Sequence, residues 1–198
     1  MNAKHWQQSY MGKIVTPELL CVEQVSYEDI AHALAQKIRF NGQCTVMGYT
    51  VAQHCVLGAL EVARVSPKHA LPFLLHEVSE VYLPDVPSPI KRLLRVEISD
   101  SDLMNWTDLE DQHARVIFKA LELSDLLPRI YEEPVKTADV RMLLTEKRDL
   151  MGPEPKPWGF DAEPYPAKIV DIWEPCYAED KWNAMFSALK NRLNRSPK

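Results

Sequence analysis

The chain has 198 residues, of which 46% are hydrophobic, 26% charged and 9% aromatic, and its formal net charge is −5. This length supports one domain with a sizeable core, and this composition excludes an intrinsically disordered chain. The negative charge argues against a general nucleic-acid binder, which would carry a basic surface. The six glycines form neither a G-x-G-x-x-G nor a P-loop pattern, so the common glycine-rich nucleotide-binding loops are excluded.

The cysteines and the apolar residues indicate where such a chain resides. The four cysteines contain no C-x-x-C pair, so the sequence predicts neither a zinc knuckle nor a disulfide scaffold. No run approaches the roughly 18 apolar residues of a membrane span, and the polar N-terminal segment lacks the apolar stretch of a signal peptide. We therefore expect a reduced, cytoplasmic protein without a membrane segment.

Helix signals recur along the chain. Six ranges have helical periodicity or capping residues: about 26–39, 51–63, 69–83, 108–123, 134–151 and 179–194. Ser26, Thr50 and Ser66 are the predicted N-cap residues of the first three, and Thr50 with Gln53 matches a capping box. Strand signals are poor and appear only in scraps such as residues 13–15. The sequence therefore predicts an all-α fold.

Proline is distributed unevenly. Six of the fifteen prolines lie between Gly152 and Pro175, which excludes a regular helix or a central strand there. Because this segment also contains Trp158, Tyr165 and Trp173, we expect an extended arm packed on the body rather than a free linker. The predicted organisation is a single domain over residues 1–198, with a core at about 26–150, a proline-rich arm over 151–178 and a C-terminal helix over 179–195.

Polar residues interrupt three apolar helix faces. His54 lies on the apolar face of the second predicted helix, His76 and Glu77 interrupt the third, and Asp139 lies on the apolar face of the fifth. Buried carboxylates are unfavourable unless they are paired or bound to a metal, so these groups would satisfy one another around a divalent cation. Their nitrogen and oxygen ligands suit Mn, Fe, Co, Ni or Zn. The structural alternative is a set of core histidines bonded to carbonyl groups.

The order His54, His76-Glu77, Asp139 resembles the H…HD…D motif of the HD-domain metal-dependent phosphohydrolases. The similarity runs through residues 29–34, 39–42, 49–54, 74–91 and 138–146, and is closer to the branch of 5′-deoxyribonucleotidase-like proteins and phage dNTP triphosphohydrolases. It implies an HD-domain helical bundle in which His54, His76, Glu77 and Asp139 bind a divalent ion (Co, Mn, Zn, Mg, Fe or Ni). It also implies a deoxynucleotide substrate, no nucleic-acid polymer, and self-association into a dimer or larger homo-oligomer.

The resemblance assigns roles to five further residues. Glu80 matches the catalytic glutamate, Asp85 an aspartate near the sugar, and Arg39 the phosphate-binding arginine. Lys91 is a candidate phosphate contact, and Phe40 a candidate contact to the deoxyribose or base. Each has a structural alternative: a residue serving a helix dipole for Arg39, a turn former for Asp85, a surface ion pair for Glu80 and a solvated charge for Lys91.

Three functions follow as hypotheses. The leading one is a metal-dependent phosphohydrolase, either a 5′-deoxynucleotidase or a dNTP triphosphohydrolase, in which a metal-activated water attacks phosphorus. Glu77 stands where the family has aspartate, which motivates the second: a degenerate domain that binds nucleotide or a protein partner without turnover. The third is a helical interaction module whose buried histidines are structural.

Overall fold

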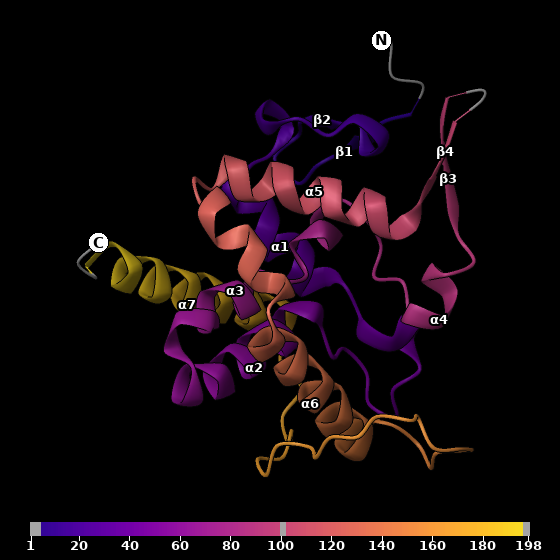
Figure 1. Cartoon of the computed structure of the whole chain (residues 1–198), viewed down its shortest axis with the longest axis vertical. Coiled ribbons are helices and arrows are strands. Elements are labelled where there is room, and N and C mark those ends of the chain that lie inside the picture. Colours follow the sequence, from indigo (N-terminus) through magenta and orange to yellow (C-terminus); the bar gives the residue numbers. More distant parts are fainter. Residues whose placement is uncertain (1–4, 100–101, 196–198) are drawn as a thin grey trace.

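Helices dominate the part of the chain that the computed structural model describes, residues 5–99 and 102–195 (Figure 1). This confirms the mostly helical class that the sequence predicts; residues 1–4, 100–101 and 196–198 of the predicted domain lie outside the described ranges. The α-helices are α1 (Tyr27–Gln36), α2 (Val51–Val65), α3 (Ala70–Leu74), α4 (Ser88–Lys91), α5 (Trp106–Ala120), α6 (Glu133–Leu150) and α7 (Pro175–Arg195). Short 3₁₀ helices span Pro17–Leu19, Val22–Gln24, Arg39–Gly42, Pro67–His69, Val78–Val81 and Ser124–Tyr131.

Two small antiparallel sheets accompany the helices. Strand β1 (Gln7–Gln8) pairs with β2 (Ile14–Val15), which falls on the short strand signal noted in the sequence. Strand β3 (Arg95–Ser99) pairs with β4 (Asp102–Asn105), and this hairpin extends away from the helices in Figure 1. The sequence did not predict the second sheet, so the all-α description is correct only for the body.

Helix α2 occupies the middle of the body. It contacts α1, α3, α6 and α7, and most of its residues are buried. Gly58 lies where α2 meets α3, and an added Cβ there would lie 2.1 Å from Cε1 of Phe73. Glycine therefore allows the close helix approach that brings three chain segments together around one end of α2. No helix in the described ranges has both the length and the apolar character needed to cross a membrane.

The helix predicted over residues 69–83 is not continuous. Helix α3 ends at Leu74, and a 3₁₀ turn resumes only at Val78. The carbonyl oxygen of Phe73 contacts the ring Nδ1 of His76 at 2.6 Å and accepts from the backbone nitrogen of His76 at 3.3 Å. This geometry replaces a regular α-helical bond to that carbonyl. The break places His76 and Glu77 in a turn rather than on a helix.

The proline-rich segment packs against the body over residues 151–174. Tyr165 is buried, and Ile169 and Trp173 pack against the core. Thr50 caps α2 as predicted by accepting from the backbone nitrogen of Gln53, but the Gln53 side chain does not complete the capping box. Instead its amide donates to the carbonyl of Asp171 at 2.7 Å and accepts from the backbone nitrogen of Trp173 at 3.0 Å. Helix α7 begins at Pro175, four residues before the predicted start.

Candidate metal centre

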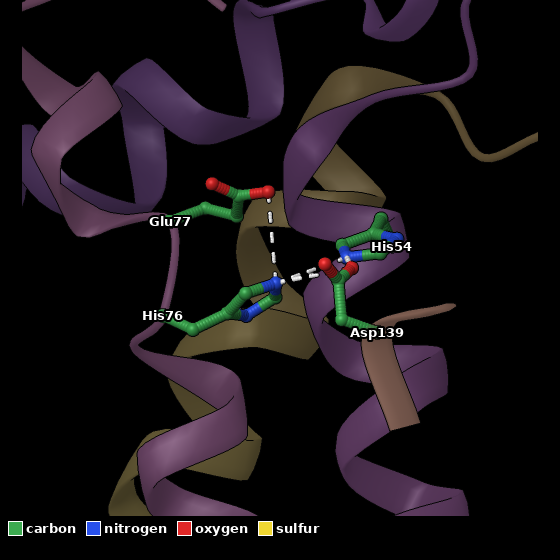
Figure 2. A group of neighbouring side chains, drawn as sticks. All are labelled: His54, His76, Glu77 and Asp139. Atoms are coloured by element: carbon green, nitrogen blue, oxygen red, sulfur yellow. Dashed lines mark hydrogen bonds and ion pairs between the residues drawn. The ribbon is translucent and has the colours of Figure 1, made fainter. Parts of the chain in front are cut away.

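Three segments bring the four predicted ligands together (Figure 2). His54 comes from α2, Asp139 from α6, and His76 and Glu77 from the turn after α3. One ligand atom from each residue lies within 4.8 Å of every other, a spacing that could hold one metal ion. The Nε2 atoms of the two histidines are 3.3 Å apart, and Asp139 Oδ1 lies 3.4 Å from that of His54 and 3.5 Å from that of His76.

The Nδ1 contacts of His54 and His76 determine which tautomer each neutral imidazole adopts. Nδ1 of His54 lies 2.6 Å from a carboxylate oxygen of Glu146, and Nδ1 of His76 lies 2.6 Å from the carbonyl oxygen of Phe73. Because both oxygens accept hydrogen bonds, each Nδ1 is the donor, and in the neutral form each ring would direct its Nε2 lone pair toward the other. Two facing lone pairs repel unless a cation or a proton lies between them. This is how metal-binding histidines are commonly oriented.

The charges of the cluster are strongly coupled. Burial lowers the pKa of His76, but the carboxylate of Glu77 and a hydrogen bond to Asp139 outweigh it and raise that pKa well above its ordinary value. Burial raises the pKa of Asp139, but hydrogen bonds to both histidines hold it well below its usual range. Without a metal, the cluster is therefore balanced by protons on the imidazoles, which a cation would replace.

The four side chains of the centre differ in their exposure to solvent. The side chain of His54 is fully buried, those of His76 and Glu77 are 10% and 18% exposed, and that of Asp139 is 40% exposed. The candidate ligand on α2 is thus the most enclosed of the four, and the candidate ligand on α6 is the most exposed. A site with three or four protein ligands and one open side can accept water or substrate, as catalytic metal sites do.

Glu146 is a buried carboxylate that the sequence reasoning did not single out. It accepts from Nδ1 of His54, from the hydroxyl of Tyr49 at 2.7 Å and from a guanidinium nitrogen of Arg39 at 3.3 Å. Burial raises its pKa, but the charges of Arg39 and His54 outweigh burial and hold the pKa of Glu146 below its ordinary value. The available signal was its position seven residues after Asp139, which is two turns along the same face of α6.

Arg39 lies between two carboxylates. Its guanidinium is 3.4 Å from Glu77 and 3.3 Å from Glu146, and its backbone nitrogen donates to the carbonyl of Tyr49. The prediction that the first helix reaches Arg39 is wrong, because α1 ends at Gln36 and Arg39 opens a separate turn. The next residues, Phe40 and Asn41, have φ angles of 56° and 52°. Arg39 is buried between these carboxylates, which argues against the alternative that it only stabilises the dipole of α1.

Glu80 is also buried. It is 1% exposed, and its Oε2 has no hydrogen-bond partner among the described groups. Burial, reinforced by Glu77 and Asp85, raises the pKa of Glu80 well above its usual range. These findings contradict the alternative of a surface ion pair and leave an unpartnered carboxyl oxygen on a residue one turn from the candidate ligand Glu77.

The three remaining residues with predicted substrate contacts, Asp85, Lys91 and Phe40, differ in their burial and partners. Asp85 is partly buried, which raises its pKa, while the charges of Arg39 and Lys91 lower it. Lys91 forms an ion pair with Glu110 of α5 at 2.7 Å, so it is not a freely solvated charge. Phe40 packs beneath the Arg39 guanidinium and against Trp158, so its ring contacts the arm as well as the arginine.

Comparison with known proteins gives relatives but no activity. No family model matches the chain. The chain is 32% identical over 143 residues to the uncharacterized protein YfdR of Escherichia coli, an alignment that covers 72% of this chain and 71% of YfdR. It is 28% identical over 155 residues to an uncharacterized protein of Rhodobacter capsulatus, covering 74% of each chain. The chain therefore belongs to the same protein family as YfdR of Escherichia coli.

Proposed function

We propose that this chain is a metal-dependent phosphohydrolase of the HD-domain type that acts on deoxynucleotides. The observation that carries the proposal is the pair of histidine Nε2 atoms, 3.3 Å apart, beside the carboxylate of Asp139. Because both Nδ1 atoms are committed to acceptors, these lone pairs are free only for a proton or a cation. The order of the four ligands along the chain supports the HD-domain assignment.

The residues present fit a divalent ion, with His54, His76, Glu77 and Asp139 as its ligands. When bound, such an ion makes water more acidic and neutralises charge on a phosphoryl oxygen. Arg39 has a guanidinium nitrogen 3.4 Å from the ligand Glu77, so a phosphoryl group at the centre would meet this cation. A guanidinium can bind two phosphate oxygens at once, which favours a phosphate-containing substrate.

Glu80 is the candidate for proton transfer. Its buried carboxyl has a raised pKa and an unpartnered oxygen, so it is suited to hold a proton for the leaving oxygen. A cation among the neighbouring ligands would lower this pKa, which favours the ionised form that accepts a proton from water. The geometry does not distinguish removal of one phosphate from removal of triphosphate, so we keep both reactions within the proposal.

A second candidate function follows from the contact between Arg39 and Glu77. A carboxylate that pairs with the arginine competes with phosphate for the same nitrogen, which is expected of a domain that binds nucleotide without turnover. Restoring the aspartate distinguishes the two functions. If Glu77→Asp raises turnover by orders of magnitude from near zero, the natural protein is a binding protein; if the natural protein already turns over substrate, the binding hypothesis is wrong.

The proposal is tested in two steps on the full chain. Elemental analysis of protein purified without chelator should find about one transition-metal ion per chain, and its absence after reconstitution with Mn²⁺, Co²⁺ or Zn²⁺ would favour the interaction module. The metal-loaded protein is then incubated with dAMP and with dATP, and phosphate and triphosphate are measured separately. Release of either product supports the phosphohydrolase, and release of neither from any natural deoxynucleotide would overturn it.

A further inference from the structure

A cluster of two aromatic rings and two cations lies beside the candidate metal centre. The rings of Phe40 and Trp158 have centroids 6.3 Å apart and are tilted by 50°. The guanidinium carbon of Arg39 lies 5.4 Å above the Phe40 ring, and Nζ of Lys147 lies 5.4 Å above the Trp158 ring. Arg39 also contacts the candidate ligand Glu77, so this one arginine links the aromatic cluster to the metal centre.

The aromatic cluster is not what holds the arm to the body. Tyr165, Ile169 and Trp173 of the arm belong to or pack against the hydrophobic core, whereas Phe40 and Trp158 are outside that set of described residues. The arm is further held by Arg148, which donates to the carbonyls of Tyr165 and Ala167. Trp158 is therefore a large, partly exposed ring that the packing of the arm does not require.

The backbone at Phe40 has an unusual conformation. Its φ angle of 56° lies in the left-handed region, which is uncommon for a bulky residue, and Asn41 continues it at 52°. Such conformations are unfavourable and persist where the surrounding structure enforces them, often at binding sites. Here the guanidinium of Arg39 contacts Glu77 and Glu146, while the ring of the next residue, Phe40, meets Trp158 of the arm.

We propose that Trp158, presented by the proline-rich arm, forms with Phe40 the surface that binds the base of the nucleotide. This inference rests on the proposed function, since Arg39 and the metal centre would hold the phosphate end of the same molecule. All nucleobases can stack on aromatic side chains, whichever hydrogen-bonding groups the base carries on its edge. Nearby cations strengthen such contacts. Lys147, which also forms an ion pair with Glu154 of the arm, supplies a cation at the Trp158 end.

The arrangement assigns the two parts of the substrate to different chain segments. The phosphate meets residues of the body, while the base meets a residue that lies more than a hundred positions further along the chain than Phe40. Stacking alone does not read the hydrogen-bonding edge of a base, so several bases should bind with similar affinity. The aromatic cluster thus predicts affinity for the base without strong discrimination among bases.

The test compares two ligands that differ only by the base. Binding of dAMP and of 2-deoxyribose 5-phosphate to the metal-loaded full chain is measured by calorimetry for the natural protein, Trp158→Ala and Trp158→Phe. We expect Trp158→Ala to weaken dAMP binding about ten-fold or more, which is the size of effect typical of lost base stacking. Binding of 2-deoxyribose 5-phosphate should be unchanged, and Trp158→Phe should retain most of the dAMP affinity. Phe160→Ala is the matched control, because Phe160 is a 46% exposed aromatic residue of the same arm.

Three results would overturn the inference. Trp158→Ala binding dAMP as tightly as the natural protein would show that the ring does not contact the base. Equal weakening of both ligands would show that Trp158 only positions the arm or the phosphate site. A natural protein that binds neither ligand would refute the 5′-deoxynucleotidase form of the proposed function together with this inference, whereas binding of both ligands with no effect of the substitution refutes the inference alone.

Discussion

At the scale of single residues, the proposed metal binding depends on the two Nε2 atoms that face each other. Removing one imidazole by His76→Ala should eliminate stoichiometric metal, because it removes a ligand and leaves a gap beside Asp139 that water fills. We expect the metal affinity to fall by more than about 100-fold, since loss of a mere outer partner already lowers it about 10- to 100-fold. Metal content by mass spectrometry after dialysis measures the effect.

His32→Ala is the control for His76→Ala. His32 is also partly buried, and its ring contacts Glu179 at 3.1 Å, but it lies on α1 outside the centre. This variant should keep one metal per chain. If both variants keep the metal, the assignment of His76 as a ligand is wrong; if both lose it, the loss is not specific to the centre and the assignment loses its support.

In the proposed centre, Glu146 would orient the candidate ligand His54 without contacting the ion itself. In Glu146→Gln the ring of His54 loses a charged acceptor, and Arg39 loses one of its two carboxylates. We expect metal affinity to fall about 10- to 100-fold, in line with other carboxylates that support a metal-binding histidine. Titration of the metal-free protein with Co²⁺ or Zn²⁺ measures this affinity.

The control for Glu146→Gln is Glu179→Gln. It removes the charge from a carboxylate that also contacts an imidazole, that of His32, but Glu179 lies on α7 and is not one of the four residues of the cluster. Unchanged affinity in Glu179→Gln together with weakened affinity in Glu146→Gln supports the role of Glu146. Wild-type affinity in Glu146→Gln contradicts it.

At the scale of elements, the centre depends on how closely α2 approaches α3. Gly58→Ala improves helix propensity by about 1 kcal/mol, but the new Cβ would lie 2.1 Å from Cε1 and 2.3 Å from Cζ of Phe73. Overpacking of this kind costs about 1–3 kcal/mol, so we expect net destabilisation. Since the carbonyl of Phe73 orients His76, the displaced residue should also weaken metal binding.

Chemical denaturation and metal titration of Gly58→Ala measure the two effects, with Gly152→Ala as the control. An added Cβ at Gly152 meets only Thr45 Cγ2 at 4.0 Å, so that variant should stay within about 0.5 kcal/mol of the natural protein. A Gly58→Ala protein as stable as the Gly152→Ala protein would contradict the packing argument.

Local sequence signals predicted the helices well where residues within one segment determine its secondary structure. Periodicity and capping residues placed α2, α5 and α6 within a few residues, because these signals act within a turn or two of the chain. They failed at Leu75–Glu77, where a side chain of the turn itself occupies the carbonyl of Phe73. They also missed the hairpin of β3 and β4, whose strands stabilise each other and carry little individual signal.

The same limit applies to the candidate site. The sequence singled out the four ligands because each places a charge or an imidazole on an apolar face, and the structure brings these four together. Glu146 escaped notice because its importance comes from Arg39, Tyr49 and His54, which converge on it from distant parts of the chain. A buried carboxylate with three donors is a property of the tertiary fold, which no local pattern encodes.

At the scale of the whole molecule, the protonation of the centre links stability to pH. The folded pKa of His76 is raised well above 6.5 and that of His54 is raised as well, so both bind protons more tightly in the folded state. Their contribution to the free energy of unfolding is fully present below the unfolded value of about 6.5 and is lost as pH rises through the higher folded values. Asp139 acts in the opposite sense: its folded pKa is lowered, so its contribution is lost only in strong acid.

A divalent ion should change this dependence, because it replaces the imidazole protons. We expect the metal-free protein to lose stability between neutral and alkaline pH, while metal affinity rises over the same range as competing protons leave. Metal at 100 times its dissociation constant adds about 2.7 kcal/mol, which corresponds to a melting temperature roughly 5–10 °C higher for a chain of this size. Thermal unfolding across pH, with and without Mn²⁺, measures both effects. A metal-induced shift that does not grow with pH would mean that the ion does not displace protons from His54 and His76, and so does not bind between them.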